Sequence, residues 1–154
     1  MSTKENQNNA RRWLSQGLED LKSARVLRDA QLYPASCFFA QQGAEKAMKA
    51  ILVARGDALR SHALADLKQS VEVVLADGHP LPALAGVGRL DRYYLGTRYP
   101  DALPDGATAQ SVFDAQDADE AIGTAERVVT ALAEWLKEDQ NHPESEESSG
   151  HSPV

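Results

Sequence analysis

FFAQQGAEKAMKA, residues 38–50, is the stretch that decides the fold expected for this chain. Its apolar residues recur at helical spacing, yet most of them are alanines, and Gly43 lies in the middle. A helix face built from such small side chains lets the backbone of a neighbouring helix approach closely. We therefore predict a helix with a narrow packing seam, formed by Cys37, Ala40 or Gln41, Ala44, Ala47 or Met48, and Ile51.

The polar residues of this stretch need a separate explanation. Gln41 lies on the predicted seam, where a buried amide without hydrogen-bond partners would cost about 1–3 kcal/mol. Gln42, Glu45, Lys46 and Lys49 are expected at the rim of the helix, where Glu45 and Lys49 form an i,i+4 ion pair. The polar residues are therefore interpreted as a solvated face plus one hydrogen-bonded glutamine.

The helix that contains this stretch has recognisable ends. Pro34 suits a first helical position, and Gly56 suits the position that follows the last helical residue, Arg55. Upstream, apolar residues at helical spacing alternate with charged ones and predict an amphipathic helix over 9–31. The first half of the chain is thus expected to be a pair of long helices.

Three more helices are predicted in the second half. Ser61 is the expected N-cap of a third helix, and a fourth is expected over about 82–97. The segment RYPDALPDGATAQ, residues 98–110, contains two prolines and a glycine and is predicted to be a surface loop. A fifth helix begins with a capping box, Asp117-x-x-Glu120. Because no segment alternates with a period of two, the chain is predicted to be an all-α antiparallel bundle.

Length predicts one domain, and the charge is distributed unevenly along it. The chain has 154 residues and a net charge of −7, but residues 1–60 carry a net charge of +4 and residues 61–154 a net charge of −11. Removing the five acidic residues of 138–154 from the total leaves −2, which is compatible with an exposed basic surface. We predict a disordered N-terminus at 1–8, a helical domain at 9–137 and an acidic disordered tail at 138–154.

Several classes of protein and site are disfavoured by composition. The sequence has neither a run of about eighteen apolar residues nor the apolar core of a secretory signal, so a cytoplasmic protein without membrane contact is expected. Cys37 is the single cysteine and is interpreted as a core residue, which leaves no internal disulfide and no Cys-rich zinc site. His79 is interpreted as solvated, and His142 and His151 lie in the predicted tail; such scattered histidines form no ligand cluster, so no metal and no cofactor are predicted.

Several short motifs follow one another along residues 10–137. They are Leu14, Glu19-Asp20-Leu21, Tyr33-Pro34-Ala35, FFAQQGAEKAMKAIL at 38–52, Gly56, Ser61-His62-x-Leu64 and DRYYLGTRYPD at 91–101. In this order they resemble the HEPN domain family. The resemblance implies an up-and-down bundle of four long helices plus a fifth, similar to the C-terminal domain of kanamycin nucleotidyltransferase. It also implies a homodimer.

One class of HEPN proteins consists of metal-independent ribonuclease toxins. Their site is implied to be an arginine followed after four to six residues by a histidine on a late helix, paired across a dimer. Histidine can transfer protons near neutral pH, and arginine can stabilise phosphate charge. Here Arg92 has no histidine at that spacing, so the motif is absent from the expected helix. The spacing does occur at Arg55 and His62, which are weak catalytic candidates because a helix end and Gly56 separate them.

A second class lacks that motif and is implied to act with a minimal nucleotidyltransferase, as substrate-binding partner or as toxin to its antitoxin. Guanidinium groups bind phosphate through forked hydrogen bonds, and tyrosines can stack on bases. The opposing interpretation is that the arginines pair with nearby acids and that the tyrosines belong to the edge of the core. The predicted nucleotide- or phosphate-binding residues are Arg89, Arg92, Tyr93, Arg98 and Tyr99, with help from Lys46 and Lys49.

Three functions therefore stay open at the level of sequence. The first is a non-catalytic HEPN module that binds nucleotide or RNA phosphate beside a minimal nucleotidyltransferase, in a toxin–antitoxin-like pair. The alternatives are a ribonuclease toxin that uses Arg55 and His62, and a dimeric scaffold that holds a partner protein. The empty position in the late helix favours the first.

Overall fold

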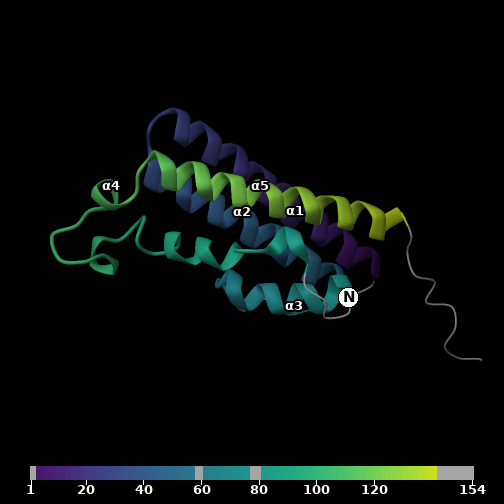
Figure 1. Ribbon diagram of the computed structural model, residues 1–154. Coiled ribbons are helices and arrows are strands. Elements are labelled where there is room, and N and C mark those ends of the chain that lie inside the picture. The colour runs from purple at the N-terminus through teal and green to yellow at the C-terminus, as the bar shows by residue number, and fades with distance from the viewer. Residues whose placement is uncertain (1–2, 58–60, 77–80, 142–154) are drawn as a thin grey trace, which may run out of the picture.

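A computed structural model describes residues 3–57, 61–76 and 81–141, which form helices and turns without any strand among them (Figure 1). The predicted all-α class is confirmed. The elements in chain order are α1 (Thr3–Asp29), α2 (Tyr33–Ala54), α3 (Leu64–Ala76), the 3₁₀ helices η1 (Pro82–Leu84), η2 (Val87–Tyr93) and η3 (Pro100–Ala102), the short α4 (Ala109–Val112), and α5 (Ala115–Asn141).

Helices α1 and α2 form a tight antiparallel pair, and both ends of α2 are as predicted. The turn between them places Gln31 in the left-handed region with φ of 63°, and the N–H of Leu32 bonds back to the carbonyl of Leu27 at 2.9 Å. Pro34 lies in the first turn of α2. Gly56 follows the C-cap with φ of 74°, a conformation that glycine adopts without a steric penalty.

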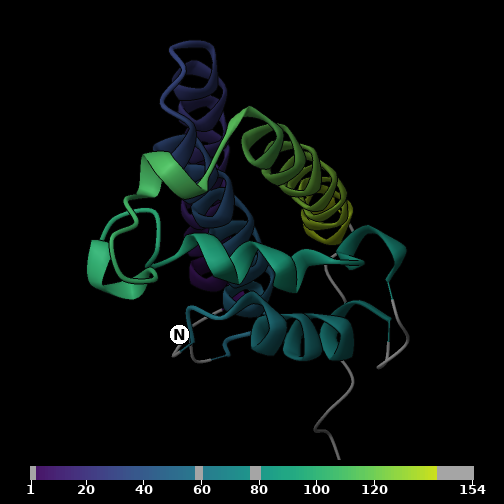
Figure 2. The ribbon, with the colours of Figure 1, turned by 60° about the vertical axis from the view of Figure 1, so that its left-hand side comes forward.

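Helix α2 is the centre of the fold. It packs against α1 and α5 on two sides and against α3 and η2 on another, and Figure 2 shows α3 and η2 crossing the direction of the α1–α2 pair. Sixteen of its 22 residues are buried, including Met48 and Ile51, neither of which has any exposed surface. The many alanines explain this position, because small side chains allow neighbours to pack on several faces of one helix.

The closest approach in the α1–α2 pair occurs between Gly17 and Gly43. A Cβ atom added to Gly43 would lie 3.0 Å from the carbonyl oxygen of Gly17, and one added to Gly17 would lie 2.9 Å from that of Gly43. Real Cβ atoms essentially never lie as close as 2.9 Å to such an atom, and 3.0 Å is at the tight limit of observed contacts. The predicted tight seam is confirmed, and its contact on α1 is a second glycine.

The fourth predicted helix is present as 3₁₀ turns rather than as α-helix. Gly86 has φ of 74° and separates η1 from η2, which interrupts any continuous α-helix. The buried residues of this segment are spaced by three: Leu84, Val87, Leu90 and Tyr93. A 3₁₀ helix has three residues per turn, so this spacing places Val87, Leu90 and Tyr93 of η2 on the one face that packs against the core.

The ends of the domain differ from the sequence expectation. Residues 3–8, expected to be disordered, form the first turns of α1, and residues 138–141 of the expected tail form the last turn of α5. The rest of the tail, 142–154, lies outside the described residues.

The capping box of α5 lies three residues earlier than predicted. Asp114 and Asp117 each accept a hydrogen bond from the other's backbone N–H, both at 3.0 Å. The helix therefore starts at Ala115, and Asp117 is the third helical residue instead of the cap.

Candidate functional site

Contrary to the prediction of a solvated face, the rim of α2 is buried at Glu45 and Lys49. Glu45 and Lys49 are 3% and 5% exposed, and they form an ion pair with 3.5 Å between Oε2 and Nζ. Nζ of Lys49 also lies 5.7 Å from the ring centroid of Trp13 on α1. The prediction was wrong because α1 and the segment before α3 cover this face, a contact between residues distant in sequence.

Lys46 belongs to a second buried ion pair at the α1–α2 crossing. Its ammonium group bonds to the carboxylate of Asp20, which is 4% exposed. Gln16, one turn earlier on α1, donates to the other oxygen of Asp20 at 3.3 Å. Asp20 therefore holds a lysine and a glutamine in place, one on each helix.

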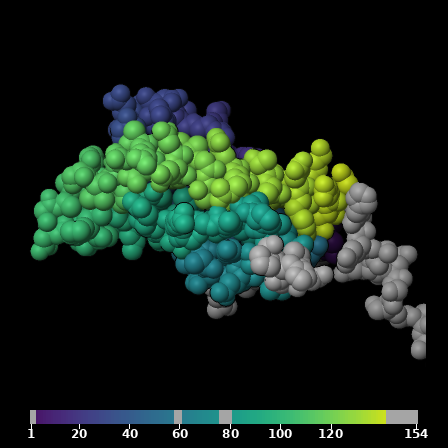
Figure 3. All heavy atoms as spheres, in the orientation of Figure 1, coloured from purple at the N-terminus to yellow at the C-terminus, as the bar shows by residue number. Residues whose placement is uncertain are grey.

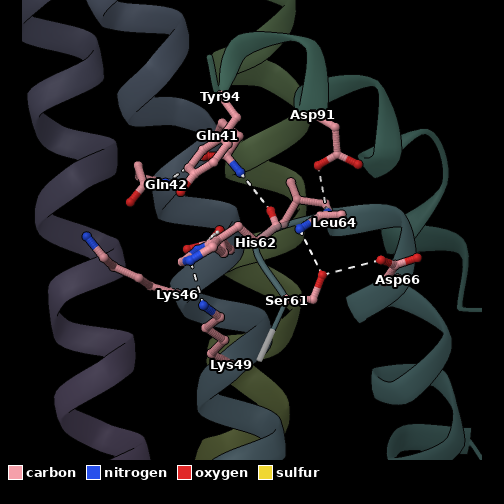
Figure 4. Close-up of polar contacts among 12 residues, drawn as sticks. Gln41, Gln42, Lys46, Lys49, Ser61, His62, Leu64, Asp66, Asp91 and Tyr94 are labelled. Atoms are coloured by element: carbon pink, nitrogen blue, oxygen red, sulfur yellow. Dashed lines mark hydrogen bonds and ion pairs between the residues drawn. The ribbon is translucent and has the colours of Figure 1, made fainter. Parts of the chain in front are cut away.

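Gln41 is fully buried and its amide has partners, as the prediction required. Its Nε2 donates to the backbone carbonyl of His62 at 3.3 Å, and its Oε1 accepts from Gln42 at 2.7 Å (Figure 4). A hydrogen-bonded amide avoids the cost of an unpaired buried group. Gln41 thereby connects α2 to the segment that leads into α3.

His62 lies over α2 with its ring held on two sides. Nδ1 is 3.1 Å from Oε1 of Glu45, and the ring stacks on Tyr94 with centroids 5.3 Å apart and 15° between the planes. The side chain is 58% exposed, whereas Glu45 is buried. A carboxylate beside Nδ1 orients the imidazole, and the Nε2 edge of a histidine oriented in this way can transfer protons.

Arg98 lies in an aromatic cluster next to His62. Its guanidinium carbon is 4.4 Å from the ring centroid of Phe38, 4.9 Å from Tyr94 and 5.1 Å from Tyr99. Its Nε donates to the carbonyl of Tyr94 at 2.8 Å. Tyr94 thus contacts both Arg98 and His62, so an arginine and a histidine share one aromatic ring.

Arg55 does not contact His62 but lies against α5. Its guanidinium makes two hydrogen bonds to Asp139 on α5, at 2.9 and 2.8 Å, and lies over Trp135. His62 contacts Glu45, ten residues before Arg55, which corresponds to about 15 Å along a helix. The spacing match between Arg55 and His62 therefore does not correspond to a shared site.

A separate groove lies between η2 and α5. It has a volume of about 420 Å³ and includes Arg89, Arg92 and Tyr93 from η2 and Glu120, Thr124 and Arg127 from α5 among its lining residues. The two elements lie side by side on the face in Figure 3. Arg92 bonds to Asp117 at 3.2 Å, and Arg127 donates to the backbone carbonyls of Ala83 and Ala85.

Tyr93 forms a wall of this groove but offers no free ring face. It is 4% exposed, and its ring packs edge-on against Phe113 with centroids 5.5 Å apart. Burial raises the pKa of its phenol to about 12, so the side chain is neutral. The interpretation of Tyr93 as part of the core is the one that its burial supports.

The comparisons with known proteins agree on one family. The HEPN domain matches residues 10–136. The chain belongs to the HEPN family. This HEPN chain is 28% identical over 135 residues to a Methanocaldococcus jannaschii protein named "Putative toxin MJ1304". The matched region covers 84% of this chain and 89% of that protein.

Two solved structures share the HEPN fold of this chain. TT1696 from Thermus thermophilus has a TM-score of 0.73 and 33% identity, over 82% of this chain and 98% of that one. ST0689, described as an archaeal HEPN homologue, has a TM-score of 0.64 and 31% identity, over 82% of this chain and 97% of that one.

The predicted binding residues of the HEPN chain thus occupy two surfaces. Arg89, Arg92 and Tyr93 line the η2–α5 groove. Lys46, Lys49, Arg98 and Tyr99 belong to the polar and aromatic contacts along α2. Sequence reasoning missed Arg127, which lies between apolar positions of α5 without any motif, and the contact between Glu45 and His62, which are 17 residues apart.

Two further observations concern metals and membranes. Within residues 3–57, 61–76 and 81–141, no three His, Cys, Asp or Glu side chains gather as a metal site. In the same ranges, no helix is long and apolar enough to cross a membrane.

Cys37 is buried, and burial raises the pKa of its thiol to about 12, so it is an unreactive core residue as predicted.

Proposed function

We propose that this HEPN protein binds nucleotide or RNA phosphate in the η2–α5 groove and acts as a homodimer with a minimal nucleotidyltransferase in a toxin–antitoxin pair. The observation that supports the binding role is the gathering of Arg89, Arg92 and Arg127 around one groove, with Glu120 as the acidic residue of its lining. Forked guanidinium donors match the oxygens of a phosphate group.

The charges of the groove are incompletely neutralised. Arg89 is exposed, and its guanidinium makes no ion pair or hydrogen bond within the described part of the chain. The partners of Arg127 are backbone carbonyls, which carry no formal charge. Asp117 forms an ion pair with Arg92, and Glu120 adds one more negative charge to the lining, so three arginines face two carboxylates. The set therefore retains positive charge that a phosphate group would complement.

The toxin role is supported by the name of the Methanocaldococcus jannaschii relative. Expression of this chain alone is then expected to arrest bacterial growth, and co-expression of a nucleotidyltransferase partner is expected to relieve the arrest. A purified complex of the two proteins would also test the scaffold alternative. If capture of the partner and growth arrest both survive Arg89→Ala with Arg92→Ala, a scaffold role is favoured and the binding proposal is rejected.

The direct test measures binding of ATP and of a short single-stranded RNA by calorimetry at low salt. Arg89→Ala with Arg92→Ala is expected to weaken binding about tenfold or more, because two phosphate contacts are lost. Lys22→Ala, which removes an exposed charge on α1, is the matched control and is expected to change little. Absence of heat with both ligands, or equal affinity of the double variant and the wild type, rejects the proposal.

The contact between Glu45 and His62 favours a second candidate, a metal-independent ribonuclease. A histidine oriented by a buried carboxylate, with Arg98 on the same aromatic ring, has the residue types for proton transfer and phosphate stabilisation. The pairing of His62 with Arg98 here replaces the Arg55–His62 pair expected from spacing.

Cleavage of single-stranded RNA in the presence of EDTA tests this candidate. His62→Gln and Arg98→Ala are expected to abolish cleavage, whereas Arg55→Ala is expected to retain it. A wild-type protein that leaves RNA intact, or cleavage that persists in His62→Gln, eliminates the ribonuclease.

A further inference from the structure

A pocket between α1 and α2 has a composition that the η2–α5 groove lacks. Its volume is about 440 Å³, within the usual range for small-ligand sites. Its lining residues are Asn9, Arg12, Trp13, Gln16 and Lys46, none of which lines the η2–α5 groove. It therefore combines an indole ring, a guanidinium, an ammonium and two amides in one hollow.

Two observations show that the wall of this pocket is fixed before any ligand arrives. Lys46 and Gln16 are both bonded to Asp20, whose side chain is 6% exposed. Trp13 packs against the hydrophobic core and has Nζ of Lys49 5.7 Å from its ring centroid. Preorganised side chains lose little conformational entropy on binding, which favours affinity.

The charge of the pocket is carried by Arg12. Lys46 is neutralised by Asp20, but Arg12 is exposed and donates to Oδ1 of Asn9, a neutral group, at 3.3 Å. An adjoining hollow of about 500 Å³ shares Arg12 and Gln16 and adds Arg11, Ser15 and Glu19. The two arginines of this hollow outnumber its one carboxylate, so it keeps a net positive charge.

We infer that this pocket binds a nucleoside phosphate, with the base against Trp13 and the phosphate at Arg12. Stacking on an aromatic side chain and pairing with an arginine are the two contacts by which proteins bind single-stranded nucleic acid without base readout. Both a free nucleotide and one unit of an RNA strand carry this chemistry. The adjoining hollow at Arg11 is placed to take a following phosphate of a strand.

Fluorescence of Trp13 tests this inference. The variant Trp135→Phe removes the second of the two tryptophans, so the remaining emission reports on Trp13 alone. Titration with AMP and with a hexanucleotide of oligoadenylate at low salt is expected to quench this emission in a saturable way. Saturation by both ligands indicates a mononucleotide site, and saturation by the oligonucleotide alone indicates a site for a strand.

Three variants in the Trp135→Phe background decide the outcome. Arg12→Ala is expected to raise the dissociation constant about tenfold, with an unchanged circular dichroism spectrum because Arg12 is exposed. Lys22→Ala, about three turns further along α1, is expected to have no effect. Arg89→Ala with Arg92→Ala is also expected to leave the quenching unchanged, because these residues line the η2–α5 groove.

Three results would overturn the inference. They are a lack of saturable quenching with both ligands, quenching that Arg12→Ala leaves intact, and quenching that the Arg89 and Arg92 double variant abolishes. The last result would mean that Trp13 reports on the groove. Failure of the groove proposal gives a different result. The affinity measured by calorimetry would then be the same for the Arg89 and Arg92 double variant as for the wild type, while Arg12→Ala would still reduce the quenching of Trp13.

Discussion

The carbonyl oxygen of Gly43 lies 2.9 Å from the position that a Cβ atom on Gly17 would occupy. This contact sets the separation of α1 and α2. It brings Asp20 on α1 into contact with Lys46 on α2, and Lys46 also lines the pocket that these two helices share. The alanine- and glycine-rich composition of α2 is therefore tied directly to a candidate binding surface.

Gly43→Ala is expected to destabilise the protein by about 1–3 kcal/mol, because the added methyl group forces two backbones apart. The matched control is Gly123→Ala on α5, where an added Cβ meets nothing within 4 Å. That change is expected to stabilise the helix by about 0.5–1 kcal/mol. Urea denaturation of both variants provides the comparison, and equal effects of the two substitutions would refute the close contact.

Asp91 of η2 caps α3 from outside the helix, and its removal is expected to destabilise that helix. Its two carboxylate oxygens accept from the backbone N–H groups of Leu64 at 2.6 Å and Ala65 at 3.2 Å. Asp91→Ala is expected to cost about 0.5–2 kcal/mol, as for loss of other helix caps. Asp101→Ala removes an exposed carboxylate nearby in sequence and is expected to be close to neutral in the same urea experiment. A similar loss in both variants would contradict the capping role.

The buried pair of Glu45 and Lys49 is expected to show strong coupling. Removing one partner leaves the other charge buried without compensation, so Glu45→Ala is expected to cost about 3–5 kcal/mol. A double variant, Glu45→Leu with Lys49→Met, removes both charges and is expected to recover most of that loss. A double-mutant cycle completed by the single variants Glu45→Leu and Lys49→Met measures the coupling by thermal or urea unfolding. Additive single effects would show that the two side chains do not depend on each other.

Asp114 is expected to make the stability of α5 depend on pH in the acid range. The hydrogen bond from the N–H of Asp117 holds the pKa of Asp114 below its usual value of 3.8. Because the folded-state pKa is the lower one, its contribution is present above the unfolded value and is lost as pH falls through the folded value. Asp114→Asn keeps a neutral cap. Its unfolding free energy is expected to fall less than that of the wild type below about pH 4.

The control for this pH series is Asp101→Asn, which removes one carboxylate without disturbing the α5 cap. Its unfolding free energy, measured by urea denaturation at each pH, is expected to follow the wild-type profile. Parallel profiles for Asp114→Asn and the wild type would refute the contribution of this cap.

Much of the fold was predictable because its signals are local. The small residues of α2 predicted a close helix contact, Pro34 and Gly56 marked the ends of that helix, and burial of Cys37 followed from its position on the seam. The segment predicted as a fourth helix is 3₁₀ in η2, where the buried residues Val87, Leu90 and Tyr93 are three positions apart.

The sites were less predictable because their contacts join distant residues. Arg89 and Arg92 were predicted from one motif, but the groove they line is completed by Arg127, 35 positions after Arg92. Glu45 was predicted to be solvated because helical spacing alone placed it at the rim. His62, from another part of the chain, contacts its carboxylate, and Trp13 of α1 contacts its ion-pair partner Lys49.

Side-chain size, periodicity and turn residues by themselves determined that this chain forms an all-α bundle around one alanine-rich helix, and the order of its motifs carried the resemblance to the HEPN family. These properties act over one or two helical turns, so they can be read along the sequence. Only the tertiary structure decided which charges are buried and which arginines share a groove. Those outcomes depend on how helices cross and which loops cover them, and a linear pattern holds little information about such long-range packing.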